Sequence, residues 1–191
     1  MSMLVTACVT GGVADGGPYR CEGTGDVRIA AGHTSVGFEP IADGDELPAW
    51  LRPQGGIGTR INVRLEGFSD EAVFTSLRTR FLGLDPGDEC ATEPEICGIR
   101  GSCEDGQCRT LLADQTNARF PIECQPDGSL LVAEMPVRFR NQFELDELDG
   151  VAQQLEVTLV PTEGNPISVS VPVVLRVGEF LQPSWWEEGS P

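Results

Sequence analysis

The chain has 191 residues, enough for one domain with a substantial core, and its 30 Asp and Glu exceed its 13 Lys and Arg by a net charge of -17. This surplus of acid repels the phosphates of nucleic acids and of anionic lipids, so nucleic acid is excluded as a partner class. No apolar run approaches the roughly 20 residues of a membrane-spanning helix. We therefore expect membrane attachment only through a lipid anchor.

The seven cysteines indicate disulfides and an oxidising compartment: the periplasm, the outer membrane or the extracellular space. Five of them lie between Cys90 and Cys124, at spacings that lack the paired C-x2-C knuckles of zinc sites. The single histidine, His33, is far away in sequence. The pattern therefore favours disulfides over a bound metal.

Residues 4–8, LVTAC, resemble the lipobox at which bacterial signal peptidase cuts lipoprotein precursors, with Cys8 as the acylated residue. This hypothesis requires a basic and apolar segment ahead of Leu4. Setting Cys8 aside leaves six of the seven cysteines, which can close as three disulfides. The alternative is a disulfide between Cys8 and Cys21 with one thiol left over. Under either interpretation we expect residues 1–25 to form a flexible tether.

Residues 26–178 are predicted to form the folded domain, because short runs of β-branched residues with period two are separated by Gly, Pro, Asn and Asp. About eight or nine strands are expected. They fall at 27–31, 36–41, 57–65, 73–81, 111–112, 120–122, 131–139, 155–159 and 167–177. The pattern predicts an all-β, antiparallel two-sheet β-sandwich of immunoglobulin-like or fibronectin-like outline, without the Cys-Trp-Cys hallmark of true immunoglobulin domains.

Two of these strands carry the clearest alternation of buried and solvent-exposed positions. In the first, Ile57, Thr59, Ile61, Val63 and Leu65 are expected to be buried, so that Asn62 and its alternate neighbours face water. In the second, the expected wet face consists of Val132, Glu134, Pro136, Arg138 and Arg140. Pro136 cannot donate to a ladder, so it places that strand at an edge or a bulge.

An abrupt change of composition marks a small disulfide-rich insertion at about residues 84–110, and residues 179–191 form a tail that ends in SWWEEGSP. Within the insertion, CGIRGSCEDGQC (residues 97–108) resembles the G-x-C-x-x-G-x-C half of EGF-like disulfide modules. The resemblance implies disulfides between Cys90 and Cys103 and between Cys97 and Cys108. Cys21 and Cys124 are then partners.

A second resemblance covers residues 38–56, which read F-x-P-I-x-D-G-D-x-L-P and then PQGG. This pattern is similar to one in uncharacterised predicted lipoproteins of the bacterial envelope, in which a β-sandwich follows. The resemblance implies a location in the cell envelope. It brings no known activity with it.

The candidate site is the acidic, Pro/Gly-rich excursion within residues 37–64, which joins a short strand to the most regular one. Three carboxylates crowd beside Gly44, and apolar residues can anchor the loop. The candidate binding residues are Asp43, Asp45, Glu46, Trp50, Arg52 and Gln54.

Calcium is a possible ligand, because hard cations bind clustered oxygen ligands. The weak candidates are Asp43, Asp45, Asp85 and Asp88, with a further acidic group at residues 146–149. None follows the EF-hand spacing. Solvated acidic turns on a strongly acidic surface are the favoured explanation of each group.

We expect no enzymatic activity, since the sequence has one histidine, His33, and no G-x-S-x-G elbow. The favoured function is a non-enzymatic, secreted or envelope-anchored β-sandwich, a binding, adhesion or structural module that recognises a protein or glycan partner. The alternatives are a calcium-dependent adhesion module and a hydrolase.

Overall fold

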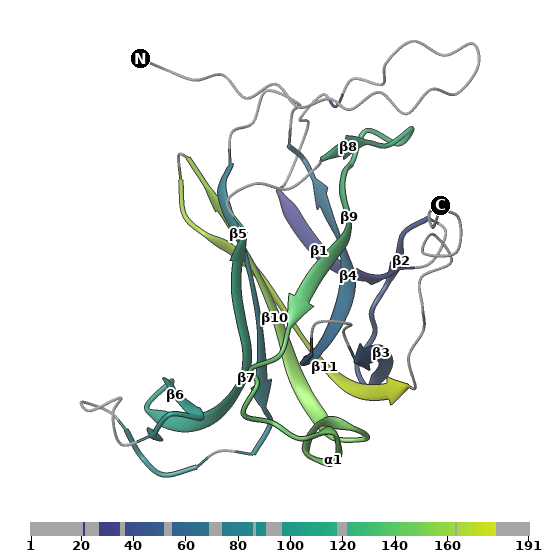
Figure 1. Ribbon diagram of the computed structural model, residues 1–191. Coiled ribbons are helices and arrows are strands. Elements are labelled where there is room, and N and C mark those ends of the chain that lie inside the picture. Colours follow the sequence, from purple (N-terminus) through teal and green to yellow (C-terminus); the bar gives the residue numbers. More distant parts are fainter. Residues whose placement is uncertain are drawn as a thin grey trace.

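In the part of the chain that the structure describes, the β-branched and aromatic runs form eleven strands, and one short helix, α1 (Leu145–Leu148), interrupts them. The computed structural model describes residues 21, 27–34, 37–51, 55–68, 74–85, 87–90, 97–117, 122–162 and 164–178. The strands are β1 (Arg28–His33), β2 (Glu39–Pro40), β3 (Asp45–Leu51), β4 (Ile57–Glu66), β5 (Phe74–Gly83), β6 (Gly101–Glu104), β7 (Gln107–Asn117), β8 (Glu123–Cys124), β9 (Leu130–Arg138), β10 (Ala152–Pro161) and β11 (Ile167–Gly178) (Figure 1).

Hydrogen bonds join the strands into one mixed sheet in the order β2-β1-β4-β3-β11-β10-β5-β7-β6, while β9 pairs with β4, and β8 pairs with β9. Strand β3 joins the two parts of this sheet. It is antiparallel to β4 over Ala49–Leu51 and parallel to β11 from Asp45 to Trp50. The expectation of a purely antiparallel arrangement is therefore wrong at this pair.

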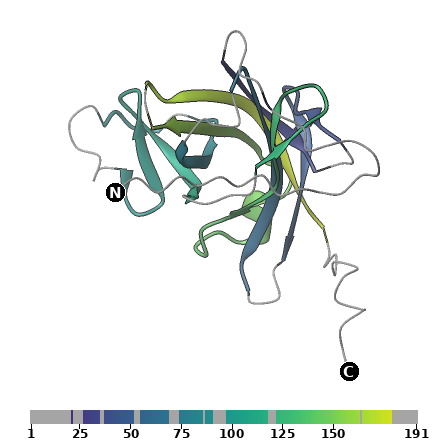
Figure 2. The ribbon, with the colours of Figure 1, turned by 90° about the horizontal axis from the view of Figure 1, so that it is seen from above.

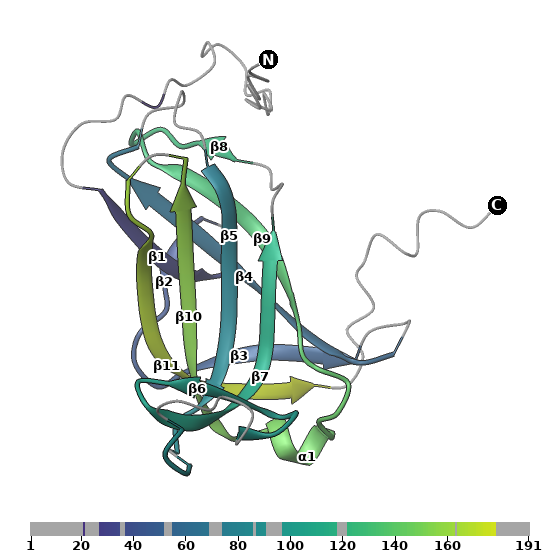
Figure 3. The ribbon, with the colours of Figure 1, turned by 90° about the vertical axis from the view of Figure 1, so that its left-hand side faces the viewer.

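Buried side chains from both parts of this sheet form one core. Figure 3 shows β11, β10, β5 and β7 side by side, with β4 crossing behind them. Figure 2 shows the same strands from above. In the core the rings of Phe81 and Phe139 have centroids 5.1 Å apart, and Ile61, Leu65 and Leu155 are completely buried. Each such side chain contributes about 1.5–3 kcal/mol by burial.

The sheet does not close into a barrel, because β7 and β9 lie beside each other without forming a ladder. Among the described residues, one main-chain hydrogen bond crosses this seam, from the Arg140 N–H to the Leu112 carbonyl at 2.9 Å. Strand β9 pairs with β4 on its other side and with β8 only at Leu130 and Leu131. The prediction that Pro136 marks an edge is confirmed, since its part of β9 has no second strand partner within the described part of the chain.

Strand β3 was not expected, because its sequence, DELPAWL, was interpreted as part of a loop. Leu47 and Ala49 nevertheless alternate with exposed neighbours and are buried on the core side. Pro48 is accommodated between them, and its carbonyl accepts a hydrogen bond from the Thr59 hydroxyl at 2.7 Å. The expected strand at 36–41 is reduced to β2, and most of the one at 120–122 lies outside the described residues.

Because β9 contains a bulge, the predicted solvent-exposed faces of β4 and β9 are wrong at Asn62 and Val132, respectively. Glu134 has a φ of 50°, and its N–H bonds to the Asn62 Oδ1 at 2.8 Å, where the β4–β9 register shifts. The Asn62 Nδ2 donates to the His33 carbonyl at 2.8 Å, so this side chain is buried with both polar groups satisfied. The extra residue also reverses the alternation. Val132 therefore lies in the core instead of facing water.

Disulfides join Cys90 to Cys103 and Cys97 to Cys108, the pairs that the EGF-like resemblance implied, and Cys21 to Cys124, the pair expected from the cysteines that remain. The predicted insertion is not separate from the sheet, because β7 begins inside it and continues as the neighbour of β5. Cys8, the LVTAC segment and the tail at 179–191 lie outside the described residues. Within the described part of the chain, no helix is long and apolar enough to span a membrane.

Candidate functional site

Asp45 and Glu46, two acidic residues expected to form one site, each form hydrogen bonds with different residues. The Asp45 Oδ2 accepts hydrogen bonds from the Ala42 N–H at 2.8 Å and from the His33 Nε2 at 3.1 Å. The Ala42 N–H and then His33 hold the pKa of Asp45 below its usual value. Glu46 accepts from the Arg176 Nε at 2.8 Å. Because neighbouring residues of a strand face opposite sides, these two carboxylates do not converge.

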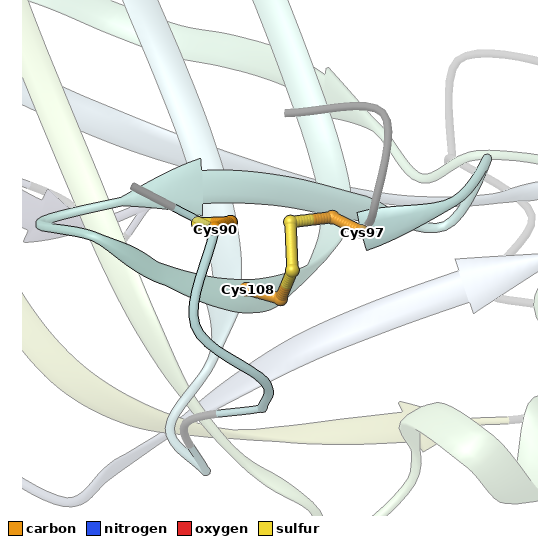
Figure 4. Close-up of side chains that lie close together, drawn as sticks. All are labelled: Cys90, Cys97 and Cys108. Carbon is orange, nitrogen blue, oxygen red and sulfur yellow. A yellow bond between two sulfur atoms is a disulfide. The ribbon is translucent and has the colours of Figure 1, made fainter. Parts of the chain in front are cut away.

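The calcium interpretation receives no geometric support from these groups. Asp43 lies exposed in the turn before β3, and Asp85 and Asp88 are exposed on the insertion. Among the described residues, the one group of at least three potential metal ligands consists of Cys90, Cys97 and Cys108, whose sulfur atoms lie within 4.8 Å of one another. Figure 4 shows these sulfurs close together beside the β6–β7 hairpin.

The three sulfur atoms are already engaged in covalent bonds. Cys97 is bonded to Cys108, and Cys90 is bonded to Cys103. A metal site would need free thiolates at these positions. The cluster is therefore a pair of adjacent disulfides, as the cysteine spacing indicated.

Trp50 is the candidate residue that lies at a cavity. A groove of about 540 Å³ opens beside the seam between β7 and β9, and we call it the seam groove. Its lining comes from β3, β4, β7, β9 and the segment that follows β9. The lining residues are Trp50, Gly58, Thr59, Arg60, Asp114, Gln115, Pro136, Val137, Arg138, Phe139, Arg140 and Asn141. Arg52 and Gln54 lie outside the described residues.

One side of the seam groove carries a neutralised arginine packed on an indole. The Arg60 Nη1 lies 2.8 Å from the Glu134 Oε2, and its guanidinium carbon is 5.6 Å from the centre of the Trp50 ring. This cation–π contact orients both side chains. Trp50 itself is held by main-chain pairing, opposite Gly58 on β4 and Gly178 on β11.

The other side of the seam groove contains a second neutralised pair. Two of the three guanidinium nitrogens of Arg78 donate to Asp114, Nε to Oδ1 at 2.8 Å and Nη2 to Oδ2 at 2.7 Å. The hydrogen bonds from Arg78 are the largest cause that lowers the pKa of Asp114, and the charges of Arg78, Arg80 and Arg140 lower it further. Asp114 is therefore fully ionised near neutral pH.

Arg138 and Arg140 have no such neutralisation. The Arg140 Nη1 donates to the carbonyl of Ile99 at 3.0 Å, and the Arg138 side chain has no hydrogen bond within the described part of the chain. Neither forms an ion pair with a described carboxylate. The seam groove thus carries two arginines that form no ion pair with a described carboxylate, although the charge of Arg140 also acts on Asp114, on a protein whose net charge is -17.

The sequence did not identify this site because its residues lie on strands far apart in the chain. Arg60, Arg138 and Arg140 were expected only on wet faces, which is the usual place for arginine. The pairing of β4 with β9 brings them together. Their alternation with apolar residues was the available signal, but it does not specify which strands are neighbours.

The groups of the seam groove are suited to binding. Guanidinium forks pair with anions, the amides of Gln115 and Asn141 offer donors and acceptors, and the indole offers an apolar surface. His33 lies elsewhere, against Asp45. No protein-family model matches the chain, and no curated protein matches it.

Proposed function

We propose that this protein is a non-enzymatic binding module, secreted or anchored at the cell envelope, that recognises a protein or glycan partner through the seam groove. The observation that carries this proposal is the placement of Arg138 and Arg140, neither of which forms an ion pair with a described carboxylate, in the groove that Trp50 lines. Guanidinium groups left unpaired in a cleft bind an anionic or polar ligand more readily than those already neutralised at the surface.

The three disulfides support the extracytoplasmic part of the proposal. Disulfides persist in oxidising compartments, and Cys21–Cys124 joins positions 103 residues apart in sequence. We include Cys8 as the lipid-anchored residue, in line with the LVTAC segment. Mass spectrometry of the protein from its own host tests this, because acylation adds a defined mass to the peptide that contains Cys8.

The core shared by both parts of the sheet supports a finer description of the fold as a two-sheet sandwich of immunoglobulin-like outline. In this description β3 is the strand shared by the two layers. The contact of Phe81 on β5 with Phe139 after β9 lies between the layers. Such a scaffold holds the residues that contact a ligand in fixed positions.

The proposal is tested by screening the purified protein against a glycan array and a displayed peptide library. The matched control is the double variant Arg138→Gln/Arg140→Gln, which removes both charges and keeps polar side chains of similar length. We expect ligands that the native protein retains and the variant loses, while circular dichroism and the melting temperature stay the same. Ligands that bind both proteins equally, or none at all from either library, would remove the seam groove as the binding site.

A further inference from the structure

We infer that the ligand of the seam groove is an extended acidic peptide segment of a partner protein, with carboxylates two residues apart. This inference rests on the proposed function and narrows it to one ligand class. Three observations carry it: the local charge, the unpaired edge of β7, and the spacing of Arg138 and Arg140.

The charge of the groove selects an anion. Glu134 neutralises Arg60, and Asp114 neutralises Arg78, so these two pairs add no net charge. Arg138 and Arg140 remain, and both line the groove. A ligand that supplies two carboxylates replaces the missing partners with charge-assisted hydrogen bonds.

The edge of β7 favours a peptide over a sugar. Residues 113–117 pair with β5 on one side, and β6 covers only Gln107–Thr110, so the other side of 113–117 has no strand partner among the described residues. An extended peptide adds to such an edge through main-chain hydrogen bonds. The exposed amide of Asn141 offers a donor and an acceptor, as a peptide unit does.

The aromatic residues of the lining do not provide a platform for a sugar ring. Phe139 is buried, with 1% of its surface exposed, and Arg60 lies over the Trp50 ring. On the opposite side, Pro136 has no N–H to donate, so β9 does not offer a complete ladder. We therefore expect the peptide to displace the hydrogen bond between Gln115 and the Arg138 N–H, to pair with β7 and to reach β9 through its side chains.

The spacing of the two arginines sets the ligand pattern. Arg138 is the last residue of β9 and Arg140 lies two positions beyond it, a separation of about 6.6 Å if the chain continues extended. In an extended peptide, side chains at positions i and i+2 lie on one face at the same repeat. The pattern Asp/Glu-x-Asp/Glu therefore matches the groove, whereas two adjacent acidic residues place one carboxylate on the far face.

The experiment uses the full chain and isothermal titration calorimetry at low salt. The probes are the capped peptide Ser-Glu-Thr-Glu-Ser, its Gln-for-Glu counterpart, the isomer Ser-Thr-Glu-Glu-Ser, and hexagalacturonate as an acidic glycan. We expect the first peptide to bind about tenfold or more tightly than either other peptide, because it alone places two carboxylates on one face for charge-assisted hydrogen bonds. Binding weakens as salt rises.

Two variants assign the site. Arg138→Gln and Arg140→Gln should each weaken the first peptide about tenfold. Arg176→Gln, at an exposed arginine that pairs with Glu46, should leave it unchanged. Tighter binding of hexagalacturonate, equal binding of the neutral peptide, or no binding of the first peptide overturns the inference. A groove-dependent glycan or neutral ligand would still leave the proposed function standing, so the two failures are distinguishable.

Discussion

The side-chain Oε1 of Gln115 on β7 accepts a hydrogen bond from the main-chain N–H of Arg138 on β9, at 3.2 Å. Two residues further along, the Arg140 N–H bonds directly to the Leu112 carbonyl. The two strands therefore touch at one point and are then held apart by the length of a side chain. Gln115 therefore bridges the two strands where the seam groove lies.

Replacing Gln115 with Leu should leave the Arg138 N–H without its acceptor. We expect faster hydrogen exchange at the Arg138 amide and a free energy of unfolding lower by about 0.5–1.5 kcal/mol, the usual contribution of one hydrogen bond. Exchange followed by NMR and urea denaturation measure the two quantities. Gln115→Glu keeps an acceptor and is the control. Unchanged exchange at Arg138 in the Leu variant would show that the bond does not form in solution.

Local patterns made part of this fold predictable. Period-two alternation located most of the strands, and Pro136 indicated an edge, because both signals depend only on neighbouring residues. Strand β3 was missed because Asp45, Glu46 and Pro48 obscured a strand whose pairing with β11 involves distant residues. Val132 was misplaced because the bulge at Glu134 depends on the Asn62 side chain.

The candidate site was predictable only at Trp50. The carboxylates of Asp45 and Glu46 looked like a cluster in sequence, but a strand sends neighbouring side chains to opposite faces, and each finds a basic partner. Arg138 and Arg140 form a site with residues of β4 and β7 only after the sheet is assembled. A pattern within one strand does not contain that information.

Arg80 should stabilise the attachment of the disulfide hairpin to the sheet. Its side chain is 12% exposed and contacts Glu104 on β6 and Glu156 on β10. Arg80→Met removes the cation that hydrogen-bonds both glutamates and leaves only the more distant charge of Arg78, so we expect the free energy of unfolding to fall by about 2 kcal/mol, less than for a fully buried pair. Arg78→Met is the matched control on the same strand. Its more exposed pair with Asp114 should cost less than about 1 kcal/mol.

The same substitution gives a pH test. Hydrogen bonding to Arg80 is the main cause that lowers the pKa of Glu104 from its ordinary 4.5. A depressed pKa in the folded state contributes stability above the unfolded pKa, and this contribution is lost as the pH falls through the folded value. The stability difference between the native protein and Arg80→Met should therefore be constant above about pH 5.5 and shrink on acidification. A difference that grows toward low pH would contradict this pairing.

Gln153 is completely buried on β10, and neither its Nε2 nor its Oε1 has a hydrogen-bond partner in the described part of the chain. An unsatisfied buried amide costs about 1–3 kcal/mol. Gln153→Met has a similar volume without polar atoms, so we expect it to raise the free energy of unfolding by about 1 kcal/mol or more. Urea denaturation measures the change, and Gln153→Glu should be strongly destabilising. A destabilised Met variant would mean that the amide has a partner, such as a buried water.

The long-range disulfide should stabilise the fold more than the disulfides of the hairpin. Cys21–Cys124 restrains the unfolded chain over a sequence separation of 103 residues, and Cys90–Cys103 over 13. In the chain-entropy model a loop of about 100 residues contributes about 4.7 kcal/mol and one of 15 residues about 3 kcal/mol.

We compare the double variants Cys21→Ser/Cys124→Ser and Cys90→Ser/Cys103→Ser in urea without reductant. Paired substitution avoids leaving a free thiol that could exchange with another disulfide. The first variant should lose more stability and show a larger denaturant slope, because its unfolded chain expands further once the long loop is released. The second should mainly loosen the β6–β7 hairpin, which proteolysis near residue 100 would detect. If the hairpin variant proves the less stable of the two, the insertion supports the sheet more than the Cys21–Cys124 disulfide does. The connection would then be β7, the strand that belongs to both the insertion and the sheet.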